Sequence, residues 1–337
     1  MSITDAGLAP DATASLPPDP EPIMRAATGF MAAKHLFVAS ELGLFEALAD
    51  GPADAFELAD RAGLPADTTR ISADAMVALG LLELEDGRYR NGAEAGFFLA
   101  GRTPTDLRPF LRFWNQLATR AWGGLEQALR GSAPAHHLTA EEVEVFSLGV
   151  ESITGGTAHA LSLQPEIGDA RRALDIGGGT GSFLRAALHS NPELSGTVVE
   201  LPSVAAIAER RLADEPRIDV IAADVLRDPL PGDHDLIIVA NLVHLFDEQG
   251  NRTLMRRLRE AASQGATLMA VDFWTDPTRT DPPAAALMAG EFLLWSEGAG
   301  RSYAEEEARD WLAEAGWTVV ERRALAGPQS VIVARAG

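Results

Sequence analysis

The stretch ALDIGGGTGSF, residues 173–183, decides how this sequence folds. It begins with a short apolar run and continues with glycines at 177, 179 and 181, after which a helical run extends from Ser182 to His189. In an open α/β sheet, ligands bind beyond the carboxyl ends of the strands, where a glycine turn lets the backbone approach the ligand closely. The stretch therefore predicts a strand, a ligand-binding turn and a helix at the start of an α/β domain.

Further strands and helices alternate after this stretch. The expected strands are 197–200, 218–221, 234–240 and 266–272, the expected helices lie near 204–213 and 249–262, and a closing pair of strands is expected at 318–322 and 329–335. Strands that alternate with helices imply a parallel sheet with right-handed crossovers. We therefore assign residues 169–337 to an α/β, Rossmann-like domain whose mostly parallel sheet ends in an antiparallel strand pair.

Residues 23–110 have a different pattern and predict a mainly α-helical winged-helix domain. Apolar residues recur at helical spacing from Ile23 to Leu48, two short helices are expected at 55–62 and 67–79, and a hairpin is expected around Asp86-Gly87. The second short helix carries two aspartates, 67 and 74, beside Arg70, so it fits a phosphate backbone poorly. A structural or dimerising role is expected instead.

Two further segments complete the domain prediction. Residues 111–168 predict a helical connector rich in aromatic side chains; such a stripe is ordinarily core, with a pocket wall as the alternative for Trp114 and Phe146. Residues 1–22 hold five prolines, several acids and no base, and predict a disordered leader.

Composition excludes several functional classes. The chain has no cysteine, which rules out disulfides, thiolate zinc sites and a cysteine nucleophile. Lys34 is the only lysine, so a phosphate-binding loop ending in Gly-Lys is absent. The net charge of −21 argues against a duplex-binding protein, because nucleic-acid affinity comes mainly from neutralising phosphates. Neither a secretory signal nor a membrane span is visible, and a cytoplasmic protein is expected.

Acidic residues stand at the carboxyl ends of three successive predicted strands. Asp175 directly precedes the glycine turn, where an acid is unfavourable for a polyanion and favourable for a cation. Glu200 ends the second strand, where a carboxylate can take both hydroxyls of a ribose. Asp224 follows the third strand, placed to accept from an adenine amino group or to serve only as a turn residue. The third glycine arrives one residue early for a dinucleotide turn. A glycine turn with acids at successive strand ends suits an adenosine with a cationic tail, and we therefore predict a site for S-adenosylmethionine.

Four motifs carry a family resemblance: LDIGGGTGSF at 174–183, VVELPSV at 198–204, AADVLRDPLP at 222–231 and NLVHLFDEQ at 241–249. With them, the chain resembles the plant- and bacterial-type small-molecule O-methyltransferase family, which joins an N-terminal winged-helix dimerisation domain to a class I methyltransferase fold. The match covers nearly the whole chain beyond the leader, including GLFEALADGP at 43–52 and GLLELEDGRY at 80–89.

The resemblance implies roles for particular residues. The methionine part of the cofactor falls on Gly177, Gly179 and Gly181, the ribose on Glu200, and the adenine edge on Asp224 and Val225. Three further residues are expected to bind the cofactor: Asp175, Leu201 and Asn241. The general base falls on His244. A histidine ordinarily titrates near 6.5 and a phenol near 10, so full deprotonation of an aromatic hydroxyl would cost roughly 5 kcal/mol, and partial proton transfer during attack costs less.

Two features around the base depart from the family pattern or complete it. Ser302 stands where the family often has a glutamate, which leaves Asp272 as the residue expected to orient His244, with Glu291 and Glu297 as more distant candidates. The segment 282–298 would supply the acceptor pocket, and Met288, Phe292 and Trp295 would form one apolar wall there or, equally, ordinary core. His136-His137, in an Ala/Pro loop, are expected to face solvent, and no metal is expected.

The sequence thus predicts a homodimeric, S-adenosylmethionine-dependent O-methyltransferase that acts on an aromatic or polyketide-derived hydroxyl of a secondary metabolite, without nucleic-acid or membrane partners. The first alternative is a relative that binds the cofactor but methylates carbon or nitrogen, or catalyses a non-methylating reaction. A winged-helix regulator that senses adenosine compounds and a nicotinamide dehydrogenase are further alternatives. The acidic charge counts against the regulator, and the glycine spacing counts against the dehydrogenase.

Overall fold

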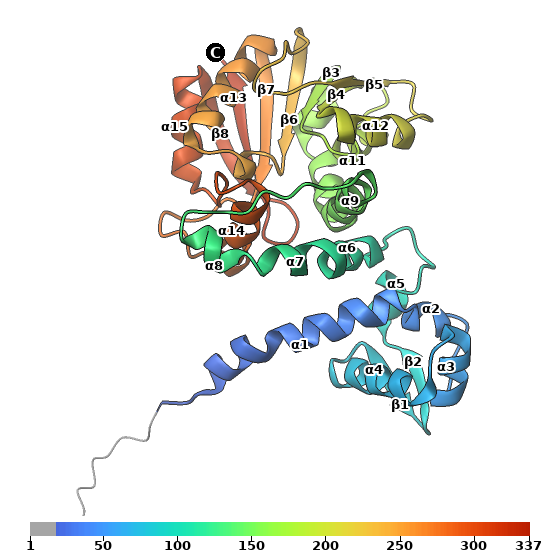
Figure 1. The fold of residues 1–337 in the computed structure, drawn as a ribbon. Coiled ribbons are helices and arrows are strands. Elements are labelled where there is room, and N and C mark those ends of the chain that lie inside the picture. Colours follow the sequence, from blue (N-terminus) through green and yellow to red (C-terminus); the bar gives the residue numbers. More distant parts are fainter. Residues whose placement is uncertain (1–17) are drawn as a thin grey trace, which may run out of the picture.

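The computed structural model describes residues 18–337 and shows two parts joined by a helical layer (Figure 1). The predicted disordered leader, 1–22, lies mostly outside the described residues, and its last two residues open the first helix. Within residues 18–337, no helix is both long and apolar enough to cross a membrane.

The N-terminal part is the predicted succession of helices and a hairpin. Its elements are α1 (Glu21–Glu41), α2 (Leu44–Ala47), α3 (Ala55–Ala62), α4 (Ala66–Ala78), β1 (Leu82–Glu85), β2 (Arg88–Asn91) and α5 (Ala93–Phe98). The long helical pattern is interrupted at Gly43, which has φ of 74°, and α3 begins with a capping box between Asp54 and Glu57. Asp86 and Gly87 both have positive φ, which is what the tight turn of a hairpin requires.

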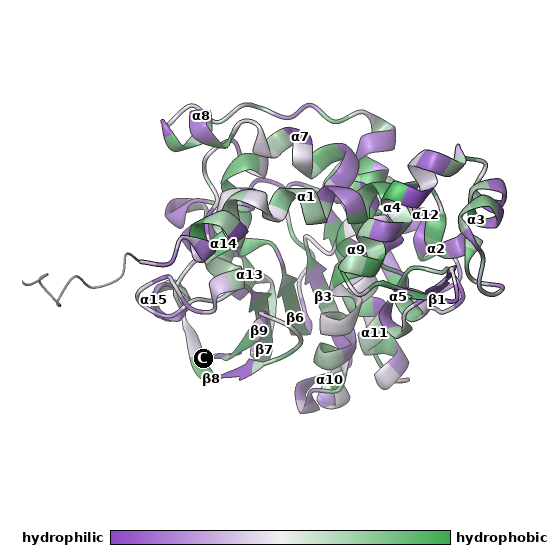
Figure 2. Cartoon of the chain, turned by 90° about the horizontal axis from the view of Figure 1, so that it is seen from below, coloured by the Kyte–Doolittle hydropathy of each residue, from purple (hydrophilic) through white to green (hydrophobic). Residues whose placement is uncertain are grey.

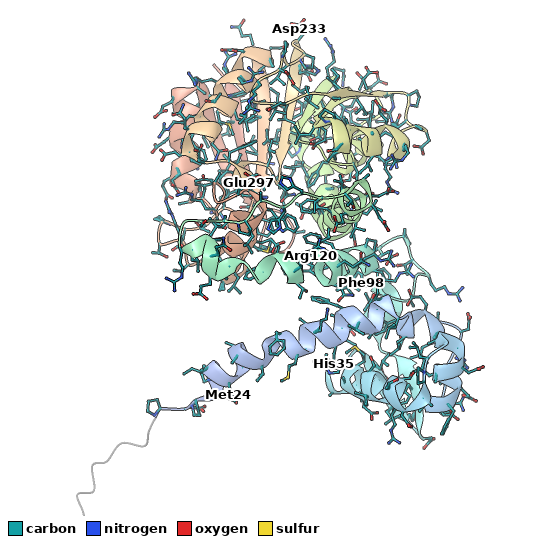
Figure 3. All side chains as sticks on the ribbon, viewed as in Figure 1. Met24, His35, Phe98, Arg120, Asp233 and Glu297 are labelled. Carbon is teal, nitrogen blue, oxygen red and sulfur yellow. The ribbon has the colours of Figure 1, made fainter. Side chains whose placement is uncertain are left out.

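Helix α1 extends away from the rest of the molecule (Figure 1), and Met24 lies near its outer end (Figure 3). Several large apolar side chains on this helix are open to solvent; Ile23 is 73% exposed and Phe30 is 70% exposed. By contrast, the inner part of the domain has a closed core that includes Phe45, Leu58 and Met76. A helix with an uncovered apolar surface of this kind marks an interaction site.

A layer of helices lies between α1 and the sheet (Figure 1). It comprises α6 (Arg108–Phe113), the π-helical η1 (Trp114–Ala118), α7 (Thr119–Trp122), α8 (Leu125–Leu129) and the long α9 (Ala140–Ser162). The predicted domain boundary at residue 110 falls inside α6. Helix α6 contacts both α1 and α9, so this connector physically links the two parts of the molecule.

The C-terminal part is a seven-stranded sheet in the order β5-β4-β3-β6-β7-β9-β8. Its elements are α10 (Pro165–Asp169), β3 (Arg172–Ile176), α11 (Ser182–Ser190), β4 (Ser195–Glu200), α12 (Pro202–Arg211), β5 (Ile218–Ala222), β6 (His234–Ala240), η2 (Val243–Leu245), α13 (Glu248–Ala261), β7 (Ala262–Asp272), α14 (Pro283–Trp295), α15 (Glu305–Glu314), β8 (Trp317–Ala324) and β9 (Ser330–Ala336). The first five strands are parallel, and β9 is antiparallel to both β7 and β8. The predicted fold class is therefore confirmed.

Apolar side chains cover both faces of the sheet, and the central strands are largely hydrophobic (green in Figure 2). Residues Leu236–Val239 of β6 are no more than 1% exposed, with alternate side chains packed against α13 and α15 on one face and α9, α11 and α12 on the other. This explains why β6 is a continuous apolar run in the sequence. Burial of each such side chain contributes about 1.5–3 kcal/mol to stability.

The direction of β6 determines where the site lies. Asp233, immediately before β6, lies at the far end of the sheet, and Glu297, just after α14, lies near the opposite end (Figure 3). Strand order reverses between β3 and β6, since β4 and β5 extend to one side and β7 to the other. Ligands of open α/β sheets bind beyond the carboxyl ends of the strands at this reversal, where Gly177 and Asn241 follow β3 and β6.

Candidate active site

A cavity of about 510 Å³ opens at this reversal point, between α9 and the loops that follow β3, β4, β5 and β6. Eight residues predicted for the cofactor or substrate site line it: Phe146, Gly177, Gly179, Glu200, Leu201, Asp224, Val225 and Asn241. Of the residues predicted for the cofactor, two do not line the cavity, namely Asp175 and Gly181. The structure thus brings together residues from four separate loops and one helix.

The glycine turn has the backbone conformation that only glycine adopts easily. Gly177, Gly179 and Gly181 have φ of 62°, 57° and 81°. A Cβ at Gly179 would meet no atom within 4 Å, so its open side faces the cavity, whereas a Cβ at Gly181 would lie 2.6 Å from Leu212. Gly179 therefore leaves room for a ligand, and Gly181 permits close packing of α11 against the end of α12.

Glu200 is held in place by the backbone around the cavity. Its Oε2 accepts a hydrogen bond from the Gly179 N–H at 3.0 Å, and its Oε1 accepts one from the Leu201 N–H at 2.7 Å. Burial raises the pKa of this carboxyl above its ordinary value, and the two backbone N–H groups partly offset the effect. Each oxygen retains a lone pair for a further donor, such as a hydroxyl group of a ligand.

Asp224 is both a turn residue and part of the cavity wall. Its Oδ1 accepts a hydrogen bond from the Leu226 N–H at 2.9 Å, and its Oδ2 pairs with Arg227 at 3.2 Å. The geometry is compatible with both interpretations of the sequence, because the side chain organises the loop after β5 while the residue remains exposed to the cavity.

Asp175 occupies a different place from the other acids. It is fully buried, and neither carboxyl oxygen has a hydrogen-bond partner of normal geometry among the described residues. Its Cγ lies so close under Gly178 that a Cβ on that glycine would be 2.7 Å away. Burial raises the pKa of Asp175 to about 7; the backbone N–H of Leu184 counteracts this in part, and the charge of Glu200 adds to it. A positive charge bound at the glycine turn would favour the ionised form.

His244 and Asp272 form the predicted pair. His244 lies in η2, and its Nδ1 is 2.7 Å from Asp272 Oδ1, which also accepts a hydrogen bond from the Phe273 N–H at 2.7 Å. Both side chains are buried. Because a carboxylate accepts, the proton of the neutral imidazole belongs on Nδ1, and Nε2 is left as the basic nitrogen. His244 itself does not line the cavity, whereas Leu242, Leu245 and Phe246 on either side of it do.

The surroundings of the His244–Asp272 pair hold its loop in place. The ring of Phe292 stacks on His244, with ring centroids 3.7 Å apart and an interplanar angle of 15°. Asp247 caps α13 by accepting from the Gly250 N–H, as the sequence predicts, so the loop that carries His244 ends at a fixed point. Ser302 bonds to the Ala285 carbonyl and supplies no carboxylate to the base.

The predicted acceptor residues fall into two groups. Trp114, Phe146 and Trp295 belong to one aromatic cluster around Phe113, of which Phe146 alone lines the cavity. Phe292 packs on His244, and Met288 is half-buried on α14.

The prediction that His136 faces solvent is wrong. Its ring packs 4.9 Å from that of Trp295, and its Nε2 is buried, because the loop before α9 folds back onto α14; His137 is exposed. Among residues 18–337, no cluster of three or more potential ligands could hold a metal.

Glu151 is a cavity residue that the sequence does not indicate. It lies on α9, where one carboxyl oxygen bonds to Arg211 of α12 and the other is buried without a partner among residues 18–337. Nothing in the local pattern distinguishes it from the other acids on that helix, because its position depends on how α9 packs over the cavity.

Comparison with known proteins identifies the family. Residues 24–101 match the O-methyltransferase dimerisation domain, and residues 131–318 match the O-methyltransferase domain. The chain belongs to the O-methyltransferase family. A curated relative of this methyltransferase, 3-hydroxy-5-methyl-1-naphthoate 3-O-methyltransferase from Streptomyces sahachiroi, is 36% identical over 314 residues, which cover 90% of each chain.

Two further relatives are similar to the methyltransferase over most of its length. N,N-dimethyltransferase OxyT from Streptomyces rimosus is 30% identical, over 88% of this chain and 90% of its own. Human N-acetylserotonin methyltransferase, solved in complex with S-adenosylmethionine, superimposes with a TM-score of 0.85 at 25% identity, over 94% of this chain and 97% of its own. The methyltransferase therefore shares its whole two-part architecture, and not only its catalytic domain, with its relatives.

Proposed function

We propose that this chain transfers a methyl group from S-adenosylmethionine to an aromatic or polyketide-derived hydroxyl of a secondary metabolite, with His244 as the general base. As a family member, it is an S-adenosylmethionine-dependent methyltransferase. The observation that supports the assignment of the base is the buried hydrogen bond between His244 and Asp272, because the residues on either side of His244 line the cofactor cavity.

The cavity suits a cationic adenosine compound. Buried carboxyl oxygens of Asp175 and Glu151 have no partner among the described residues, and such groups are costly unless a donor or a cation satisfies them. The open side of Gly179 leaves space beside the glycine turn. In this proposal Glu200 binds the ribose hydroxyls, Asp224 and Val225 border the adenine, and Asn241 and Leu201 complete the wall.

The residues of the chain supply orientation and proton transfer. The bound cofactor supplies an electrophilic methyl group on a positively charged sulfur. Asp272 fixes Nδ1 of His244, so Nε2 can accept the hydroxyl proton as the acceptor oxygen attacks. Asp272 then stabilises the imidazolium that results, and the stacked Phe292 keeps water from one face of the ring.

The acceptor is proposed to be flat and largely apolar. Phe292 next to the base, and Phe146 on the cavity wall beside Trp295, present aromatic surface on that side of the site. An aromatic or enolic hydroxyl is also far more acidic than an aliphatic alcohol, which reduces the cost of removing its proton. The naphthoate relative is named for an acceptor of this class.

The decisive experiment is incubation of the enzyme with S-adenosylmethionine carrying an isotopically labelled methyl group and with matched aromatic hydroxyl and aromatic amine compounds, followed by mass spectrometry. Labelled ether products from the hydroxyl set support the proposal. Products only from the amines would instead favour N-methylation, as the likeness to OxyT allows. Cofactor binding without any methylated product across both sets would contradict methyl transfer to this acceptor class.

We propose that the enzyme is a homodimer assembled through its dimerisation domain. The exposed apolar side chains of α1 need a cover, and a second copy provides one. Light scattering should give twice the chain mass for the wild type and a lower mass for a Phe30→Asp, Met31→Asp variant. Leu129→Asp, which alters an exposed leucine on α8, is the matched control and should keep the dimer. A monomeric wild type at micromolar concentration would refute the assignment.

The proposal also assigns the enzyme to the cytoplasm. A chain without cysteine needs no oxidising compartment for disulfide formation, and cell fractionation with an antibody to the chain provides the direct measurement.

Asp175 is expected to make cofactor binding depend on pH. The pKa of this carboxyl is raised to about 7 in the free enzyme, and a bound cation lowers it, so binding below pH 7 must release a proton. The Kd for S-adenosylmethionine, measured by calorimetry, should therefore rise about fivefold as the pH falls from 7 to 6. Asp175→Asn should abolish this dependence.

The stability of the free enzyme gives an independent check on Asp175. Its raised pKa means that the ionised form is disfavoured in the folded state, so stability is lost as pH rises from about 4 towards 7 and stays low above 7. Asp175→Asn should accordingly raise Tm at pH 8 but not at pH 4.

The control for the pH dependence of cofactor binding is 5′-methylthioadenosine, which lacks both positive charges of S-adenosylmethionine and should bind with the same Kd at pH 6 and 8. A wild-type enzyme whose cofactor affinity does not change over this range would disprove the linkage.

A further inference from the structure

Helix α14 carries a buried carboxylate that the proposed reaction does not use. Glu291 is 4% exposed, yet both of its oxygens have a donor. Oε1 accepts a hydrogen bond from the Trp295 indole N–H at 2.5 Å, and Oε2 accepts one from the Trp122 indole N–H. Burial raises the pKa of Glu291, and the two indole groups partly offset this. No hydrogen bond joins Glu291 to His244, so it does not orient the base directly.

The two indoles come from different parts of the chain. Trp295 is one turn further along α14, whereas Trp122 ends α7 in the connector. Gly290 allows the close approach of these helices, since a Cβ there would lie 3.1 Å from the Trp122 ring. The carboxylate of Glu291 is therefore the polar link that fastens α14 to the connector.

The next residue on α14 contacts the base. Phe292 stacks on the imidazole of His244, and the segment that follows α14 donates a second contact, from the Arg301 N–H to the His244 carbonyl at 3.0 Å. That segment is in turn tied back to α14, because Ser302 Oγ donates to the Ala285 carbonyl at 2.6 Å. Contacts that hold His244 from this side thus depend on where α14 lies.

We infer that Glu291 is a positioning residue for methyl transfer. By fixing α14 against Trp122, it holds Phe292 on the imidazole, so that Nδ1 stays on Asp272 and Nε2 keeps the orientation that proton transfer needs. The inference rests on the proposed role of His244 and explains how a chain with serine at position 302 orders its base with a single carboxylate beside the ring. It requires an accepting oxygen for each indole N–H, which the carboxyl group of Glu291 supplies, whereas an amide can accept at only one of its two terminal atoms.

The test compares Glu291→Gln with wild type on the same acceptor and cofactor. In the variant, the amide NH₂ faces one indole N–H, and two donors oppose each other. Displacements near 1 Å at a reacting group can cost about a hundredfold in rate, so kcat should fall at least tenfold. The Kd for S-adenosylhomocysteine should stay within twofold of wild type, because Glu291 does not line the cavity.

A double substitution distinguishes positioning from general destabilisation. In Glu291→Gln, Trp122→Phe the opposing indole donor is removed, and kcat per folded enzyme should recover part of the loss seen with Glu291→Gln alone. Leu287→Ala, on the exposed side of the same helix, is the control and should leave kcat unchanged. The indole N–H resonances of Trp122 and Trp295 in ¹⁵N-labelled protein should both shift in Glu291→Gln, which reports the two bonds without any turnover.

The outcomes separate this inference from the proposed function. A wild type that fails to methylate any acceptor contradicts the function itself. An active wild type together with a folded Glu291→Gln variant whose kcat lies within twofold overturns the positioning role. Should Glu291→Gln fail to fold, Trp122→Phe keeps the carboxylate and removes one bond. A kcat for that variant equal to wild type would overturn the role as well.

Discussion

The His244→Gln enzyme is expected to bind its cofactor normally and to turn over at least about a hundredfold more slowly than wild type. Glutamine can keep a hydrogen bond to Asp272, but its amide cannot accept a proton from the acceptor. Because His244 does not line the cofactor cavity, the Kd for S-adenosylhomocysteine should not change. Single-turnover kinetics on the acceptor identified by labelling, together with calorimetry, measure both quantities.

Asp272→Asn is the companion to that substitution. The asparagine amide can present an N–H to Nδ1 of His244 and so favour the wrong tautomer, and kcat should fall in the same direction. A His244→Gln enzyme that keeps more than half of the wild-type rate would rule out the histidine as base. It would leave positioning of the two substrates as the source of the rate.

Replacing Glu200 with alanine should weaken cofactor binding by about two orders of magnitude. A hydrogen bond to a charged group contributes about 1.5–3 kcal/mol, and the proposed contact involves two ribose hydroxyls. The change also leaves the Gly179 N–H without its acceptor and loosens the glycine turn. Calorimetric titration with S-adenosylhomocysteine gives the Kd directly.

The control for Glu200→Ala is Asp219→Ala on the neighbouring strand β5. Asp219 is an exposed acid that does not line the cavity, so removal of its charge should not change the Kd. Glu200→Gln keeps one accepting oxygen and should fall between the other two proteins. Equal affinity in Glu200→Ala and wild type would remove the ribose assignment and leave Asp224 as the remaining predicted acidic contact on the cavity wall.

The elements that could be predicted from the sequence are those whose signals are local. Strand β6 begins and ends at the predicted residues, because a strand buried on both faces must be apolar throughout. Glycines at alternate positions after β3 mark a turn that needs positive φ, and the structure has it. Glu200 and Asp224 meet at the cavity because carboxyl ends of parallel strands share one edge of a sheet.

The direction of individual side chains could not be predicted in this way. Asp175 is next to the glycine turn in sequence, but its side chain lies under the turn and not in the cavity. Glu291 is bonded to Trp122, which is 169 residues away, and no periodicity or motif encodes that pair. His136 packs on Trp295 for the same kind of reason. The positions of Glu291 and His136 depend on how the connector packs against the sheet domain.

Strand β9 occupies an interior position in the sheet although it follows every other strand in the chain. As the polypeptide leaves the ribosome, β7 and β8 emerge before β9, the strand that lies between them and pairs with both. Until then β7, which ends at Asp272, has one open edge. Asp272, the hydrogen-bond partner of His244, thus lies on a strand that pairs with β9 only after the rest of the sheet has been synthesised. A nascent chain stalled before residue 330 should therefore be a target for chaperones that bind exposed strand edges.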